Sequence, residues 1–109
     1  QDGPALTSGV TETVVLTGAC GIPANASAVA LNVTVTQGSG GGHLILFPGD
    51  FLLLPNTSTI NFQAGQTRAN NAVLSLAGDG SLAMHPAVTG GGTVHVILDV
   101  TGYFVAGAD

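Results

Sequence analysis

The sequence predicts an all-β fold, a single antiparallel β-sandwich of jelly-roll or immunoglobulin-like type with about eight strands. Two stretches, residues 29–35 and 94–100, alternate strictly between apolar residues and others. Because successive side chains of a strand point to opposite faces, each stretch has one face suited to a core and one left for solvent or a partner. Glycine and proline divide the rest of the chain into short runs, a spacing typical of sandwiches and barrels.

The other strands follow from the same patterns, and no window has a persistent helical period. The expected strands span residues 13–17, 28–36, 43–47, 51–54, 59–62, 72–76, 81–85 and 93–105. The side chains expected in the core from the two alternating stretches are Val29, Leu31, Val33, Val35, Val94, Val96, Leu98 and Val100. Gly102 interrupts the last strand and predicts a bulge or a close approach of two backbones.

Three glycine-containing connections are expected to close hairpins. Residues 78–80 read Gly-Asp-Gly, and Asp-Gly readily takes the positive φ that tight hairpin turns need. Residues 38–42 and 90–92 are longer glycine loops, and the strands on either side of each are expected to pair.

Composition excludes several kinds of partner. The chain has 109 residues, enough for one domain with a working core, and only 6% of them are charged. Arg68 is the single cation and the net charge is −5, so no basic patch exists for nucleic acid or anionic membranes. No apolar run approaches the roughly 20 residues needed to cross a membrane. A surface with so few charged residues suits an extracellular module, or a subunit whose surface is used in self-association.

Two further features concern location and covalent links. The sequence begins at Gln1, as it would after removal of a signal peptide or after trimming, and we expect a secreted or cell-surface protein. Cys20 is the single cysteine, so no internal disulfide can form. It is either a small buried apolar residue or a bridge between subunits.

No catalytic, metal or cofactor site is expected. The best candidates are His43, His85 and His95, with Glu12, Asp50 and Asp99 as possible helpers. His95 and Asp99 are about 13 Å apart along one strand, too far to share a metal directly. No metal-ligand spacing occurs, no serine or threonine lies in a nucleophile motif, and the six acids are scattered. We therefore expect a protein that is not an enzyme.

Binding of a polysaccharide is the alternative function, because sugars pack their apolar faces on aromatic rings. Phe47 and Phe62 fall within strand patterns and are expected in the core, which leaves Phe51 and Tyr103 as exposed platforms. The polar rows that could hydrogen-bond a glycan, or simply face solvent, are Asn32, Thr34, Thr36, Asn61 and Gln63.

Three asparagines lie in N-x-Ser/Thr acceptor sequences for glycosylation. They are Asn25, Asn32 and Asn56. Asn56 follows a proline in an expected loop and should be the most accessible of the three.

Most of the chain matches the pattern of a known domain in the expected order. The matching segments are residues 21–36 (GIPANASAVALNVTVT), 42–44, 47–48, 58–62, 64–67 with Asn70, and 96–104 (VILDVTGYF). On these segments the chain resembles a domain found, often in several copies, in secreted and cell-surface proteins of actinobacteria, chloroflexi and acidobacteria. The resemblance implies a β-sandwich that serves as a non-catalytic accessory or surface module, and it carries over no site residues.

The chain departs from that family at its start. The family begins with a strand of the form Arg-x-x-Asp-Thr-Arg, and nothing before Thr11 has that form. Residues 1–11 are therefore expected to be an extended N-terminal arm and residues 12–109 the sandwich domain. Either the arm is donated to the open edge of a neighbouring copy, where Ala5, Leu6 and Val10 fill shallow pockets, or it folds back onto its own sandwich.

Taken together, these features favour a structural surface or filament subunit that assembles through strand edges or strand donation. The alternative is a carbohydrate-binding accessory module of a secreted protein.

Overall fold

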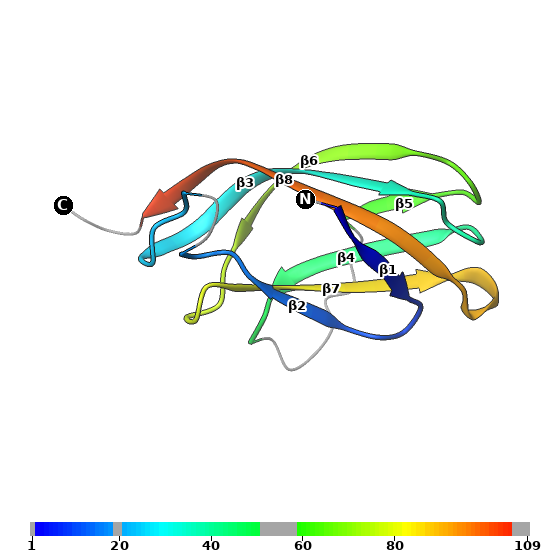
Figure 1. Ribbon diagram of the computed structural model, residues 1–109, viewed down its shortest axis with the longest axis horizontal. Helices are drawn as coiled ribbons and strands as arrows, with labels where there is room; N and C mark the ends of the chain where they lie inside the picture. Colours follow the sequence, from blue (N-terminus) through cyan, green and yellow to red (C-terminus); the bar gives the residue numbers. More distant parts are fainter. Residues whose placement is uncertain (1, 19–20, 51–58, 106–109) are drawn as a thin grey trace.

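The computed structural model describes residues 2–18, 21–50 and 59–105, which form a sandwich of two four-stranded antiparallel sheets (Figure 1). The first sheet has the order β1-β8-β3-β6, with β1 at Asp2–Thr7, β8 at Thr93–Val105, β3 at Ala26–Thr36 and β6 at Arg68–Ser75. The second sheet has the order β2-β7-β4-β5, with β2 at Glu12–Val15, β7 at Ser81–Val88, β4 at Gly42–Pro48 and β5 at Ile60–Phe62. The predicted fold class is confirmed.

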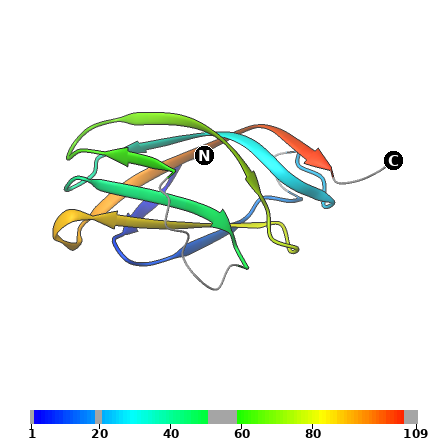
Figure 2. The same cartoon turned by 180° about the vertical axis from the view of Figure 1, so that it is seen from behind.

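The strand pairing is that of a jelly roll. β1 pairs with β8, β2 with β7, β3 with β6 and β4 with β5, so the first four strands run antiparallel to the last four in reverse order. Further pairing of β3 with β8 and of β4 with β7 rolls this long ribbon into the two sheets. Seen from behind, β6 runs along the upper rim of the first sheet, above β5 and β4 (Figure 2).

The three predicted hairpins are wrong. Residues 37–41 join β3 to β4, residues 76–80 join β6 to β7 and residues 89–92 join β7 to β8, and in each case the two strands lie in different sheets. The turn at 78–80 has the expected chemistry, since Gly80 has a φ of 83° and the Asp79 Oδ1 accepts a hydrogen bond from the Ser81 N–H at 3.0 Å. Turn residues therefore identify where the chain reverses, while the burial of the two strands decides which partners they take.

The core lies between the sheets where the alternation predicts it. Leu31 and the valines of β3 that alternate with it are almost fully buried, and Val94 and Val96 lie beside them on the same face, on the neighbouring strand β8. Leu98 and Val100 are half-buried and pack against the same cluster. Phe47 and Phe62 are also buried, as predicted, although Phe47 belongs to a second, smaller cluster with Ile45 and Ala83.

Gly102 marks a bulge, which settles the alternative left open by the sequence. Leu31 lies opposite Val100 but Ala30 lies opposite Gly102, so Thr101 is an extra residue in β8. Beyond the bulge, each side chain of β8 lies on the face of the sheet opposite to the one that simple alternation predicts. Tyr103 consequently shares the inner face, and Phe104 the outer face, of the first sheet.

The segment predicted as an N-terminal arm begins with a strand of the sandwich. β1 pairs with β8 at the rim of the first sheet, and Leu6 is only 6% exposed and belongs to the core. Within one chain the segment thus folds back onto its own domain, where β1 forms one edge of the first sheet. Ala5 is exposed on β1, and Val10 is 44% exposed in the connection to β2.

The remaining differences concern strand bounds. β6 begins at Arg68, four residues before the expected strand, because pairing with β3 outweighs the turn preference of Asn70 and Asn71. The strand expected at 51–54 lies outside the described residues. In the part of the chain that the structure describes, the one helical element is a 3₁₀ turn at Thr89–Gly91, and no helix there could span a membrane.

Candidate functional site

The outer face of the first sheet is a regular surface built mainly by β3, β6 and β8. Each of its three longer strands contributes alternate residues to it. These are Ala28, Ala30, Asn32, Thr34 and Thr36 of β3, His95, Ile97, Asp99 and Phe104 of β8, and Ala69, Asn71, Val73 and Ser75 of β6. The surface is polar but nearly uncharged, with one carboxylate, Asp99.

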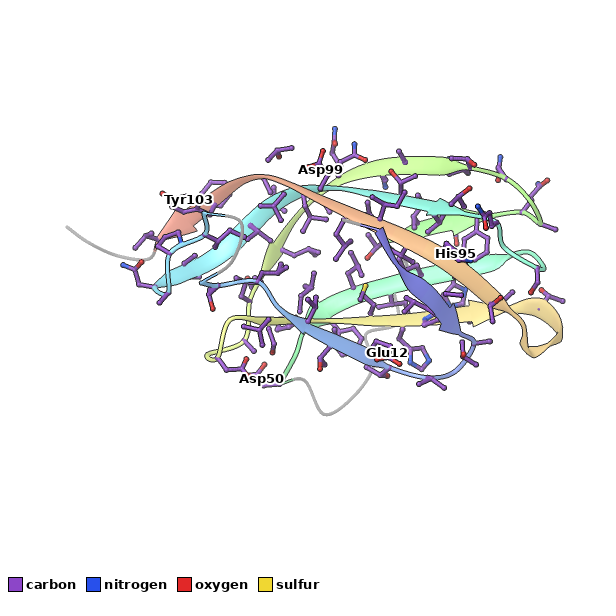
Figure 3. All side chains as sticks on the ribbon, in the orientation of Figure 1. Glu12, Asp50, His95, Asp99 and Tyr103 are labelled. Carbon is purple, nitrogen blue, oxygen red and sulfur yellow. The ribbon has the colours of Figure 1, made fainter. Side chains whose placement is uncertain are left out.

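A row of side chains capable of hydrogen bonding crosses this face. Asp99, Asn32 and Asn71 lie opposite one another on β8, β3 and β6. The Asn32 Nδ2 donates to the Asn71 Oδ1 at 2.9 Å, and the Thr34 Oγ1 donates to the Asn32 Oδ1 at 3.3 Å. Figure 3 shows Asp99 projecting outward from the sheet at the end of this row.

Beside this row the face carries a shallow hollow of about 180 Å³. Its lining residues are Ala30, Leu31, Asn71, Ala72, Val73 and Thr101. The hollow exists because Ala30 has a small side chain and because the bulge carries Thr101 out of register. The Thr101 Oγ1 donates to the Ala30 carbonyl at 3.2 Å, which leaves the hollow with neutral polar and apolar walls.

The second feature of the site is the outer edge of β6, which pairs with no further strand among the described residues. The Leu76 N–H donates to the Ser27 carbonyl at 2.9 Å, so the even-numbered residues of β6 are those that bond β3. In an antiparallel ladder the odd-numbered residues of β6 then direct their N–H and C=O groups away from β3. The resulting row of outward N–H and C=O groups, which we call the β6 edge, belongs to Ala69, Asn71, Val73 and Ser75. All four residues are exposed, and Val73 is 66% exposed.

The β6 edge lacks the devices that usually blunt an edge strand. Natural edges carry lysine, proline or a bulge that deters pairing with another chain. At the opposite rim, β1 contains Pro4 and an irregular register between Asp2 and Ala5. In the second sheet, β2 is four residues long and β5 is three. β6 has eight residues in regular register with β3, and Arg68 at its start is its one charged residue.

The candidate catalytic and metal-ligating residues do not converge. His43 and His85 lie on β4 and β7 of the second sheet, whereas His95 lies on β8 of the first. Figure 3 shows Glu12 and Asp50 along the second sheet, well apart from Asp99 on the first. The His85 Nδ1 is 2.8 Å from the Thr11 Oγ1. Among the described residues no group of three or more His, Cys, Asp or Glu side chains could hold a metal ion.

Among the described ionisable groups, Asp79 has a shifted pKa. Hydrogen bonds from the Ser81 side chain and then from the Ser81 backbone N–H lower the pKa of Asp79 below its ordinary value. Asp79 is exposed in the turn after β6, where it stays ionised and contributes a fixed negative charge close to the end of the β6 edge.

The candidate glycan platforms are only in part where the sequence placed them. Tyr103 is 49% exposed at the end of β8, but it lies on the inner face, away from the polar row. Phe104 is 51% exposed on the outer face, three residues beyond Thr101 of the hollow, and sequence reasoning missed it. The signal was Gly102, since a bulge there shifts the alternation by one residue. Phe51 lies outside the described residues.

The glycosylation acceptors differ in their accessibility. Asn25 is exposed just before β3. Asn32 is half-buried in the middle of β3, and its amide is engaged with Asn71 and Thr34. Asn56 lies outside the described residues. Of the two described acceptors, Asn25 is the better placed for modification.

Comparison with known proteins adds no assignment: no family model matches the chain, and no curated protein matches it.

Proposed function

We propose that this chain is a non-catalytic, extracellular structural subunit that assembles with copies of itself through its β-strands. The observation that carries the proposal is the arrangement of β1. This strand lies at the rim of the first sheet, is held by pairing with β8 alone, and inserts one buried side chain, Leu6, into the core. A neighbouring copy presents the same β8 and the same pocket for Leu6, so β1 can be exchanged between copies with all its contacts kept.

The segment that joins β1 to the rest of the chain is short. The Ser8 N–H donates to the Gly92 carbonyl and the Gly9 N–H to the Pro86 carbonyl, both at 2.9 Å, and Gly9 has a φ of 80°. A change of backbone angles at Ser8–Gly9 and the residues up to β2 would redirect β1 away from its own sandwich. Short hinge segments of this kind invite exchange of a terminal strand between copies.

A pair of cysteines across β1 and β8 tests strand donation. Ala5 lies opposite His95, and because Ser8 bonds Gly92, the Ala5–His95 pair is one of the non-hydrogen-bonded pairs, in which the two side chains are closest. In a Cys20→Ser background, the Ala5→Cys/His95→Cys variant should form disulfides between chains. A ladder of covalent multimers on a non-reducing gel supports donation.

Two controls make this experiment decisive. A variant with Ala5→Cys alone should give no ladder, because its partner cysteine on β8 is missing. In both cases the protein is allowed to assemble before it is oxidised. If the double-cysteine variant then runs only as an oxidised monomer, β1 stays in its own chain and donation is ruled out.

A carbohydrate-binding module is the second candidate, and the outer face of the first sheet favours it. The hollow beside Ala30 combines the amide of Asn71, the hydroxyl of Thr101 and the nearby ring of Phe104, which are groups that pack on and hydrogen-bond neutral sugars. Binding to insoluble polysaccharides, measured by pull-down, should then fall at least tenfold in Phe104→Ala and Asn71→Ala. Tyr103→Ala, on the other face, is the matched control. If all three variants bind the polysaccharide as well as the original chain does, this face is excluded as a glycan site.

A further inference from the structure

We infer that two copies of this chain pair through the β6 edge, with their β6 strands antiparallel about a two-fold axis at Val73, so that the two first sheets continue into one sheet. The inference rests on the proposed function, because it names a second contact of the same assembling subunit. The pairing is isologous, and each copy offers the other the same groups.

The backbone of the β6 edge supplies the hydrogen bonds. With Val73 opposite Val73 of the second copy, Asn71 lies opposite Ser75, and all these residues direct their N–H and C=O groups outward. The ladder ends beyond Ser75, because the Ala77 N–H already donates to the Ser81 carbonyl at 3.0 Å and the Ala77 carbonyl accepts from Gly80 at 2.8 Å. The matching row of donors and acceptors is the same on both copies and is uninterrupted by proline.

The side chains of the outer face fit this register. Val73 is the most exposed of the large apolar side chains of the described residues, at 66%. At the two-fold axis each Val73 covers the other, a cross-strand apolar pair that shields both from water. Asn71 and Ser75 beside it are small polar residues that hydrogen-bond across strands without bringing like charges together.

Charge also favours the antiparallel arrangement. With Asn71 opposite Ser75 at the end of the ladder, Arg68 at the start of one β6 lies on the same side as the second copy's turn at residues 77–80, which holds Asp79. By symmetry the dimer has this arrangement of cation and carboxylate at both ends. β6 and its neighbour β3 contain no acid, and Asp99 is two strands away from the edge, so no two carboxylates face each other along the paired strands. A parallel pairing would instead place the two Arg68 side chains together.

Sedimentation equilibrium of the full chain and of Val73→Lys tests the inference. The full chain should associate reversibly, and Val73→Lys should weaken that association at least tenfold, because two lysines then face each other at the axis. Val15→Lys is the matched control. Val15 is likewise an exposed valine on an edge strand, β2 of the second sheet, and its replacement should leave the association within twofold of the original. Circular dichroism confirms that both variants are folded.

Cysteine cross-linking gives the register. In a Cys20→Ser background, Val73→Cys should oxidise to a covalent dimer, whereas Val15→Cys should not. Association that survives Val73→Lys unchanged, or cross-linking at Val15 in place of Val73, would overturn the β6 contact and leave the assembling function intact. A full chain that stays monomeric at every concentration would overturn both.

Discussion

Leu31 and Asn32 are neighbours in β3 whose side chains point to opposite faces of the first sheet. Leu31 is 1% exposed in the core, whereas Asn32 lies on the outer face and bonds Asn71. Leu31→Ala should lower the free energy of unfolding by about 2–5 kcal/mol, because it leaves a cavity. Asn32→Ala should cost about 1 kcal/mol, the usual net value of a hydrogen bond with access to water. Denaturant unfolding of both variants measures the difference, and equal losses would contradict a core on one side only.

Asp79 should make stability depend on pH in the acid range. Its folded-state pKa is lowered by the hydrogen bonds from Ser81, so the unfolded chain takes up the proton more readily than the folded one. The stabilisation is therefore fully present above the ordinary pKa of aspartate and is lost as the pH falls through the lowered folded-state value.

The Asp79→Asn variant isolates that contribution. Its unfolding free energy should lie below that of the original chain at neutral pH, and the two should converge as the pH falls below the lowered folded-state pKa, where the original carboxyl is protonated. Urea unfolding at several pH values measures both. A difference that does not change with pH would show that the charge of Asp79 plays no part.

At the scale of single residues, the alternation in β3 and the first half of β8 was enough to predict the core. Period-two patterns work there because each strand has one buried and one open face. They failed at Tyr103 and Phe104, since the extra residue at Thr101 reverses the faces beyond it. The bulge could be anticipated from Gly102, but the residue that leaves the register depends on pairing with β3, which no local pattern contains.

The pairing of β4 with β7 depends on a glycine. A Cβ on Gly42 would run into the carbonyl oxygen of Ala87 in the neighbouring strand, and backbone atoms in a ladder cannot move aside without breaking their bonds. Gly42→Ala should therefore destabilise the fold by about 1–3 kcal/mol, the usual cost of overpacking. At Gly41 the same Cβ meets the Phe62 carbonyl oxygen at 3.5 Å and the Gln63 Cα at 3.8 Å, which are ordinary contacts. Gly41→Ala should stay within about 0.5 kcal/mol in thermal unfolding, and equal effects would contradict this account.

For the elements, strand existence was far easier to predict than strand partnership. Most expected strands are present within a few residues, because β-rich runs between glycines have no helical alternative. The connections were misread as hairpins because a turn sequence such as residues 78–80 is the same whether the next strand stays in the sheet or crosses to the other. The β6 edge could not be predicted at all, since an edge is defined by the absence of a further strand in space.

The whole molecule is built from contacts between distant parts of the sequence. β1 pairs with β8 and β2 with β7, so the outermost pairs join opposite ends of the chain. Closing such long loops costs entropy before the contacts form, and folds of this kind refold in about milliseconds to seconds. Stopped-flow refolding should find rates in this range. Refolding within microseconds would contradict a transition state that needs these distant pairings.

The pairing of β1 with β8 also has a consequence for a chain that is made from its N-terminus onward. β1 leaves the ribosome before the other described strands of the sandwich, and β8, the strand that should hold it, leaves after them. Until then Leu6 has no pocket in its own chain, while every recently finished copy nearby has one beside its β8. Where many copies emerge together, a neighbour's pocket competes with the chain's own, and dilution removes that competition. Under the proposed strand donation, the local crowding at the site of production, more than the sequence itself, then decides whether β1 closes its own sandwich or joins two.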